Sequence, residues 1–78
     1  MLIAEVLLHA TVRLNRPLHA DEDHPAIPAG TSGTIIQVFD HPGGIMVEFF
    51  DAEHRSLSLE PFTESQYRWF DLVDPVYG

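Results

Sequence analysis

The chain has 78 residues, which is enough for one domain with one hydrophobic core. Twelve acidic residues against four arginines give a formal net charge of −8, and this disfavours nucleic acid as a partner because phosphates are bound mainly by cations. There is no cysteine, so disulfide frameworks and zinc–thiolate sites are excluded.

Targeting signals are not evident in the sequence. No stretch approaches the roughly 20 apolar residues that a membrane-spanning helix needs. Residues 1–12 are apolar but contain Glu5 and His9 and lack a basic segment, so they do not have the pattern of a signal peptide. We therefore expect a cytoplasmic protein with no membrane partner, folded as a single domain over residues 1–78 with its core between about 7 and 73.

Apolar and polar residues alternate with a period of two, which indicates strands. Residues 8–14 are predicted as the first strand, and a helical turn over residues 5–9 is the alternative for its beginning. The apolar face of this strand comprises Leu8, Ala10, Val12 and Leu14. Residues 15–30 contain three prolines, which exclude a central strand and predict a long loop.

Residues 31–39 are rich in β-branched side chains and give the clearest strand prediction. Residues 40–44 read D-H-P-G-G, which is typical of a turn, and residues 45–50 are predicted as the returning strand. Phe49 and Phe50 are adjacent on this strand and must point to opposite faces. One of them therefore belongs to the core.

A second short connection leads to a predicted strand over residues 55–59, which we expect Pro61 to end. Thr63 is the expected cap of a single helical or 3₁₀ turn over residues 64–67. Residues 68–73 are predicted as the fifth strand. Five short strands cannot form a two-layer sandwich with an adequate core, so we predict an all-β, small SH3-like barrel with a long loop after its first strand.

Two segments carry a resemblance to a known family. Residues 30–38 read G-T-S-G-T-I-I-Q-V, and residues 46–51 read M-V-E-F-F-D. Together with residues 7–14 they resemble an uncharacterised bacterial family, catalogued as domain of unknown function 4926, whose members read G-x-x-G-T-(I or V)-V-x-V followed by V-E-F-x-D. The resemblance covers residues 7–67 and implies an SH3-like barrel of bacterial origin. In this family an acid is common at the position of His9.

The same glycine pattern occurs in ribosomal KOW-type modules and in the nitrile hydratase β subunit, which are other SH3-like barrels. It therefore indicates the fold more than the function. We interpret Gly30 and Gly33 as the residues that let the chain turn tightly into a curved strand. A phosphate-binding loop is not indicated, because neither a helix nor a Lys-Ser/Thr pair follows them.

The predicted long loop holds the densest group of potential metal ligands: His19, Asp21, Glu22, Asp23 and His24. Their spacing fits no known metal motif, and the glycine and terminal glutamate of an EF-hand loop are missing. We interpret Asp21, Glu22 and Asp23 as a flexible, solvated acidic loop. No metal or other cofactor is expected, although His19 and His24 would be the first ligands to test.

Catalytic residues are not indicated either, since there is no cysteine nucleophile and no serine lies in a nucleophile-elbow pattern. The aromatic residues are more informative. Phe50, Tyr67, Trp69 and Phe70 form a candidate contact surface, because aromatic side chains are enriched at binding hot spots. The alternative is that they complete the core of a small barrel.

We therefore expect a non-catalytic protein-interaction module of bacterial origin that self-associates and neutralises a basic protein partner. Two alternatives remain open. One is a KOW-like barrel that binds nucleic acid, and the other is an accessory subunit related to nitrile hydratase β.

Overall fold

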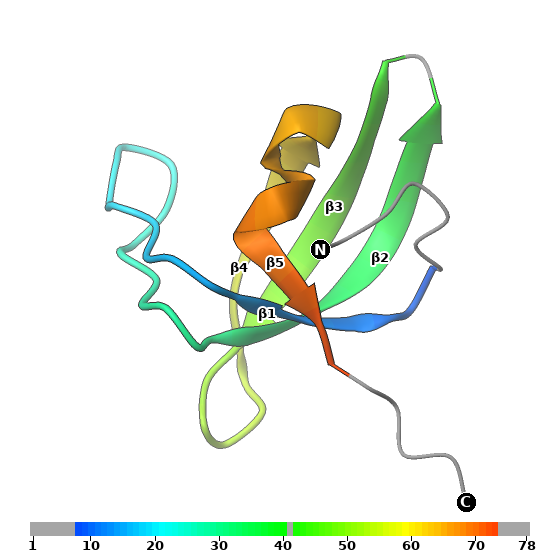
Figure 1. Cartoon of the computed structure of the whole chain (residues 1–78). Helices are drawn as coiled ribbons and strands as arrows, with labels where there is room; N and C mark the ends of the chain where they lie inside the picture. The colour runs from blue at the N-terminus through cyan, green and yellow to red at the C-terminus, as the bar shows by residue number, and fades with distance from the viewer. Residues whose placement is uncertain (1–7, 41, 74–78) are drawn as a thin grey trace, which may run out of the picture.

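The computed structural model describes residues 8–40 and 42–73, and these residues form a single antiparallel sheet with one short 3₁₀ helix (Figure 1). The elements in chain order are β1 (Thr11–Leu14), β2 (Ser32–Asp40), β3 (Gly43–Phe50), β4 (Ser56–Thr63), η1 (Glu64–Trp69) and β5 (Phe70–Leu72). The strand order across the sheet is β4-β3-β2-β1-β5. This arrangement confirms the all-β class and the predicted count of five strands.

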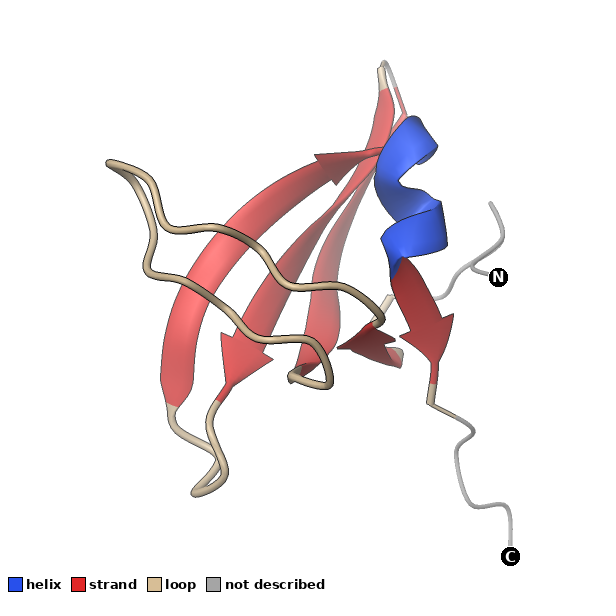
Figure 2. Ribbon diagram, turned by 60° about the vertical axis from the view of Figure 1, so that its left-hand side comes forward, coloured by secondary structure: helices blue, strands red, loops and turns tan. Residues whose placement is uncertain are grey.

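The sheet is strongly bent, as Figure 2 shows for the long strands β2 and β3. Its ladders shift register between Ile35 and Gln37 and again between Phe49 and Phe50, and such bulges increase the local twist. In the described residues no ladder joins the edge strands β4 and β5. Instead the rings of Phe62 on β4 and Phe70 on β5 meet edge to face, with centroids 4.8 Å apart. Aromatic packing therefore connects the two edges of the sheet.

The core lies on the concave side of this sheet. Its centre is Phe49, whose ring stacks on Phe70 at 6.2 Å and meets Phe62 edge to face at 6.0 Å. The buried hydrophobic residues are Val12, Leu14, Ile27, Ile35, Ile45, Val47, Phe49, Phe62 and Phe70. Phe49 is thus the inward-facing member of the predicted Phe49–Phe50 pair.

The two glycines of the G-x-x-G motif serve different purposes. Gly30 has φ +90° and no atom within 4 Å of a hypothetical Cβ, so its backbone conformation is what requires glycine. Gly33 lies in β2, and a Cβ there would come within 2.6 Å of Val47 Cγ1 and 3.1 Å of Phe49 Cδ1. The turning role predicted for both glycines therefore applies to Gly30, while Gly33 allows close packing on β3.

The first strand is shorter than predicted. It begins at Thr11, because residues 8 and 9 form a turn in which His9 has φ +72° and Leu8 is exposed. The alternative of a helical turn over residues 5–9 lies largely outside the described residues. The period-two pattern still placed Val12 and Leu14 correctly in the core.

Two boundaries near the C-terminal end were also predicted wrongly. Pro61 does not end β4 but lies within it, opposite Met46. Proline is tolerated there because β4 is an edge strand and its outer side needs no donor. The fifth strand begins at Phe70 rather than Arg68, because η1 continues to Trp69.

The 3₁₀ turn itself was predicted correctly with its cap. Thr63 is the N-cap residue, and its backbone N–H donates to Gln66 Oε1 at 2.8 Å. No helix within residues 8–40 and 42–73 is long and apolar enough to span a membrane.

The predicted loop is a folded arm, which we define as residues 15–31. Leu18 and Ile27 exchange backbone hydrogen bonds of 2.8 and 2.9 Å, and Ile27 is fully buried in the core. Figure 2 shows the two sides of the arm running together across the core side of the sheet. The prolines exclude a regular strand but leave room for this single bridge, so the arm is a structured part of the domain.

We expect Ile27→Ala to lower the free energy of unfolding by about 2–5 kcal/mol, because it removes buried methyl groups and leaves a cavity. Ile27→Val should cost about 0.5–1.5 kcal/mol. Urea denaturation followed by circular dichroism measures both. The exposed neighbour serves as the control: Ala26→Ser should stay within about 0.5 kcal/mol of the wild type. A neutral Ile27→Ala would contradict an anchored arm.

A second prediction separates the two glycines. We expect Gly33→Ala to cost about 1–3 kcal/mol through overpacking against Val47 and Phe49, and Gly33→Asn to be at least as damaging. At Gly30 the penalty is backbone strain, which Asn tolerates better than Ala. Gly30→Asn should therefore be more stable than Gly30→Ala in thermal and urea unfolding, and the reverse order at Gly30 would refute this assignment.

Candidate functional site

The structure does not bring the four predicted contact aromatics together on one surface. Phe70 is fully buried in the core, so its assignment to a contact surface is wrong. Phe70 is the first residue of the short strand β5, and its ring points inward to pack on Phe62 of β4. This packing links the two edges of the sheet. Phe50 lies at the end of β3, whereas Tyr67 and Trp69 lie on η1, half-buried against the core.

Trp69 acts mainly as a cover of the core. Its ring meets Phe62 edge to face at 6.3 Å, and the guanidinium of Arg16 lies 5.1 Å above the ring centroid. The indole Nε1 is buried and has no hydrogen-bond partner among the described residues. Asn15 holds this end of η1, since its backbone N–H donates to Trp69 O at 2.8 Å and its side-chain amide donates to Arg68 O at 2.9 Å.

The opposite side of the sheet carries a more open apolar surface. Core side chains of β3 alternate with Met46, Glu48 and Phe50, which point away from the core. The ladders extend this face onto β2 and β4, and the ring of Phe39 there lies over Gly44, 3.6 Å from a hypothetical Cβ. We define the outer face as Thr34, Gln37, Phe39, Met46, Glu48, Phe50, Leu59 and Pro61.

The outer face is mainly apolar, and Glu48 is its one ionisable residue. Leu59, which the sequence analysis did not select, is 53% exposed on β4 directly opposite Glu48. The alternation of Leu57 and Leu59 with serines predicts a strand but does not show which side of the sheet each leucine faces. That side depends on the bulge opposite Phe49 and Phe50. Leu59 could therefore be assigned to the outer face only from the pairing of β3 with β4 in the structure.

An open groove of about 920 Å³ continues from the outer face. Phe50 and Leu57 line it from the β3–β4 hairpin, and residues 28–34 line it from the end of the arm and the start of β2. Phe50 and Thr34 belong to both the groove and the outer face. Of the four predicted aromatics, Phe50 is thus the one that contributes to an accessible apolar surface.

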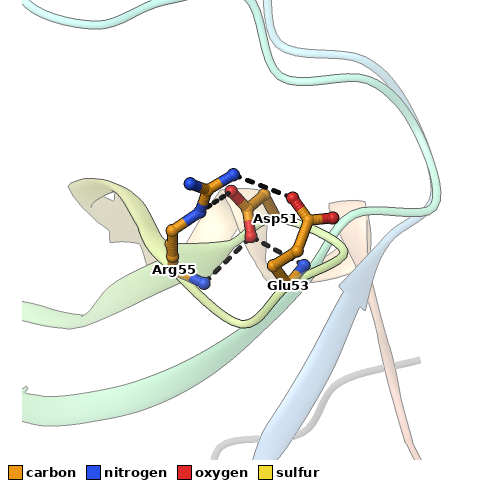
Figure 3. Close-up of polar contacts among 3 residues, drawn as sticks. All are labelled: Asp51, Glu53 and Arg55. Carbon is orange, nitrogen blue, oxygen red and sulfur yellow. Dashed lines mark hydrogen bonds and ion pairs between the residues drawn. The ribbon is translucent and has the colours of Figure 1, made fainter.

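The β3–β4 connection at the rim of the groove is a preorganised turn (Figure 3). Asp51 Oδ1 accepts the backbone N–H groups of Glu53 at 2.8 Å and of Arg55 at 2.9 Å. The Arg55 guanidinium bonds Asp51 Oδ2 at 3.1 Å and Glu53 Oε1 at 2.8 Å. The pKa of Asp51 is lowered, chiefly by the backbone N–H of Arg55, and the side chain of Arg55 adds to this effect.

The predicted acidic residues Asp21, Glu22 and Asp23 lie exposed at the tip of the arm. Local hydrogen bonds fold this tip: the backbone N–H of Asp21 donates to His24 O at 3.0 Å and that of Asp23 to Asp21 Oδ1 at 2.7 Å. Across residues 8–40 and 42–73, no three His, Asp or Glu side chains are grouped so that they could hold a metal ion. His19 and His24 therefore gain no support as ligands from the fold.

Three of the four arginines come from neighbouring segments, although they look scattered in the sequence. Arg13 lies on β1 opposite Asp71, Arg16 covers Trp69, and Arg68 lies on η1. The fourth, Arg55, is occupied by two carboxylates. Among these arginines, Arg16 thus contacts an aromatic ring and Arg55 contacts two carboxylates.

In comparisons with known proteins, no family model, no curated protein and no solved structure matches this chain.

We expect Asp51 to stabilise the fold at neutral pH and to lose this effect in acid. Because its pKa in the fold lies below the ordinary 3.8, the contribution is present above that value and disappears as the pH falls through the lowered pKa. Asp51→Asn keeps an acceptor for the two N–H groups, whereas Asp51→Ala removes it. Urea unfolding midpoints measured between about pH 5 and pH 2 test this. Near pH 5 the midpoint should be highest for the wild type, lower for Asp51→Asn and lowest for Asp51→Ala.

At the lower end of that range the wild type should approach Asp51→Asn, because a protonated Asp51 has also lost its charge. The gap between Asp51→Asn and Asp51→Ala should stay constant, since neither variant titrates at this position. A gap between the wild type and Asp51→Ala that stays constant with pH would contradict an ionised Asp51 as the organiser of the turn.

Proposed function

We propose that the chain is a non-catalytic protein-interaction module that self-associates through the outer face. The observation that carries this proposal is an apolar sheet face on which Leu59 is exposed and Phe39, Met46 and Phe50 are half-buried, with one ionisable residue among its eight members. The cores of protein interfaces are enriched in aromatic residues and methionine and depleted of charge. Exposed apolar patches of this kind mark interaction sites.

The charge distribution favours a second copy of the chain as the occupant. Two molecules with a formal charge of −8 repel each other, so they can associate only through a surface on which little of that charge lies. The outer face meets this condition, because Glu48 is its one ionisable residue and neither the arm tip nor the β3–β4 turn contributes an acid to its eight members. A two-fold axis would pair the face with itself, as in most homodimers.

The resemblance of residues 7–67 to an uncharacterised bacterial family supports a bacterial origin for this module. It also supports the comparison with other SH3-like barrels that work by binding. KOW-like nucleic-acid binding and an accessory role like that of nitrile hydratase β are the competing interpretations of the same resemblance. The net charge of −8 argues against the first of them.

Light scattering after size-exclusion chromatography tests self-association. The wild type should elute with twice its chain mass of 8.8 kDa at concentrations near 100 µM, which is about the affinity range of a small apolar interface. Leu59→Glu places a second carboxylate beside Glu48 and should return the protein to 8.8 kDa. Glu48→Gln should strengthen the dimer, because it removes the like charge from both copies.

Leu72→Glu is the matched control, since Leu72 is 50% exposed on β5, at the other edge of the sheet. It should leave the dimer intact. Circular dichroism checks that all variants fold. A wild type that stays at 8.8 kDa at the highest concentration would refute self-association.

A basic protein partner is a second candidate function, and the acidic balance of 12 to four favours it. Such a partner would be drawn to the carboxylates of the arm tip rather than to the outer face. Binding of a lysine-rich peptide should then weaken steeply with added salt and with Glu22→Lys. Binding that is unaffected by both changes would exclude this electrostatic mode without affecting the dimer proposal.

A further inference from the structure

The tip of the arm contains a histidine whose two ring nitrogens both face oxygen atoms. His24 Nδ1 lies 2.8 Å from the carbonyl oxygen of Pro25, and Nε2 lies 3.3 Å from Asp21 Oδ2. The side chain is only 14% exposed, so water has limited access to replace either contact. The ring therefore depends on these two oxygens for its hydrogen bonds.

The carbonyl oxygen of Pro25 is a hydrogen-bond acceptor and cannot donate. When Asp21 is ionised, the same is true of its Oδ2. A neutral imidazole has one N–H and one nitrogen lone pair, so in either tautomer one ring nitrogen would point its lone pair at an oxygen. The imidazolium has two N–H groups and satisfies both contacts. The observed geometry is therefore complementary to the charged form of His24.

The charged groups around the ring act in the same direction. Asp21 and Asp23 come from the arm, and Glu60 comes from β4. All three are carboxylates, and they favour a positive charge on the imidazole. The pKa of His24 is raised above 6.5, first by the hydrogen bond to Pro25 and then by Asp21, Glu60 and Asp23, while desolvation opposes them.

We propose that His24 is a proton-operated latch that holds the tip of the arm folded when charged and releases it when neutral. The fold binds this proton more tightly than the unfolded chain does. The latch is therefore fully engaged below the ordinary histidine pKa of 6.5, and its stabilisation is lost as the pH rises through the raised pKa. Release leaves the carboxylate of Asp21 without its cation, so the arm tip becomes more negative and less ordered.

Asp21→Asn is the decisive variant. The amide keeps an oxygen to accept the N–H of Asp23, so the turn is preserved, but it presents an N–H donor where Asp21 Oδ2 faced the ring. That donor pairs with the lone pair of a neutral imidazole and so reverses the preference at Nε2. Glu22→Gln is the matched control, because it removes the same charge from the same exposed tip and His24 has no assigned contact with Glu22.

Nuclear magnetic resonance titration of the histidine rings between about pH 4 and pH 9 measures the effect. We expect the wild type and Glu22→Gln to titrate His24 above 6.5, with both ring nitrogens protonated on the acidic side. Asp21→Asn should titrate at a clearly lower pH than Glu22→Gln. A shift of one unit between these variants corresponds to a tenfold change in proton affinity. Equal values in the two variants, or a neutral His24 throughout, would overturn the latch.

Hydrogen exchange of the Leu18 and Ile27 amides, corrected for the intrinsic rate, gives a second readout at the bridge below the arm tip. Protection should fall as the pH rises through the His24 titration in the wild type and in Glu22→Gln. It should not depend on pH in His24→Gln, which cannot be charged. The latch would be refuted if His24→Gln showed the same pH profile as the wild type.

Discussion

The aromatic contact between Phe62 and Phe70 is the interaction on which the architecture depends. The hydrogen-bonded ladders end at β4 and β5, and no ladder among the described residues joins these two strands. Apart from the chain through η1, the packing of Phe62 against Phe70 is what links them. Phe49 lies behind both rings and contacts each of them. Because a domain of this size buries only about 60–65% of its surface, three large rings in mutual contact form a major share of its core.

This packing requires a sheet that bends. The bulges in β2 and β4 supply local twist, Gly33 allows β2 to approach Val47 and Phe49, and Gly30 turns the chain from the arm into β2. The arm then covers the core side through Ile27. One side of the sheet is thereby closed by the arm and η1, which leaves the other side as the accessible apolar surface.

The two proposals follow from this division into sides. Among residues 8–40 and 42–73, the arm, η1 and the aromatic cluster lie on the core side, so none of them covers the outer face. Glu60 on β4 contributes to the acidic surroundings of His24 at the arm tip. The surface proposed for association and the proposed pH-sensitive element are therefore on different parts of the molecule, and each can be altered without the other.

The local sequence by itself determined the fold class, the positions of most strands, the turn after β2, the capped turn at Thr63 and the opposite directions of Phe49 and Phe50. These features depend on period-two alternation, turn chemistry and capping, which act over a few residues. The tertiary structure alone decided which strand is at an edge, and so why Pro61 can lie within β4. It also decided that Phe70 is buried, that Ile27 anchors the arm, and that Leu59 faces outward. Those outcomes depend on register, bulges and contacts between residues far apart in the chain, because only the folded chain determines which side of the sheet is covered.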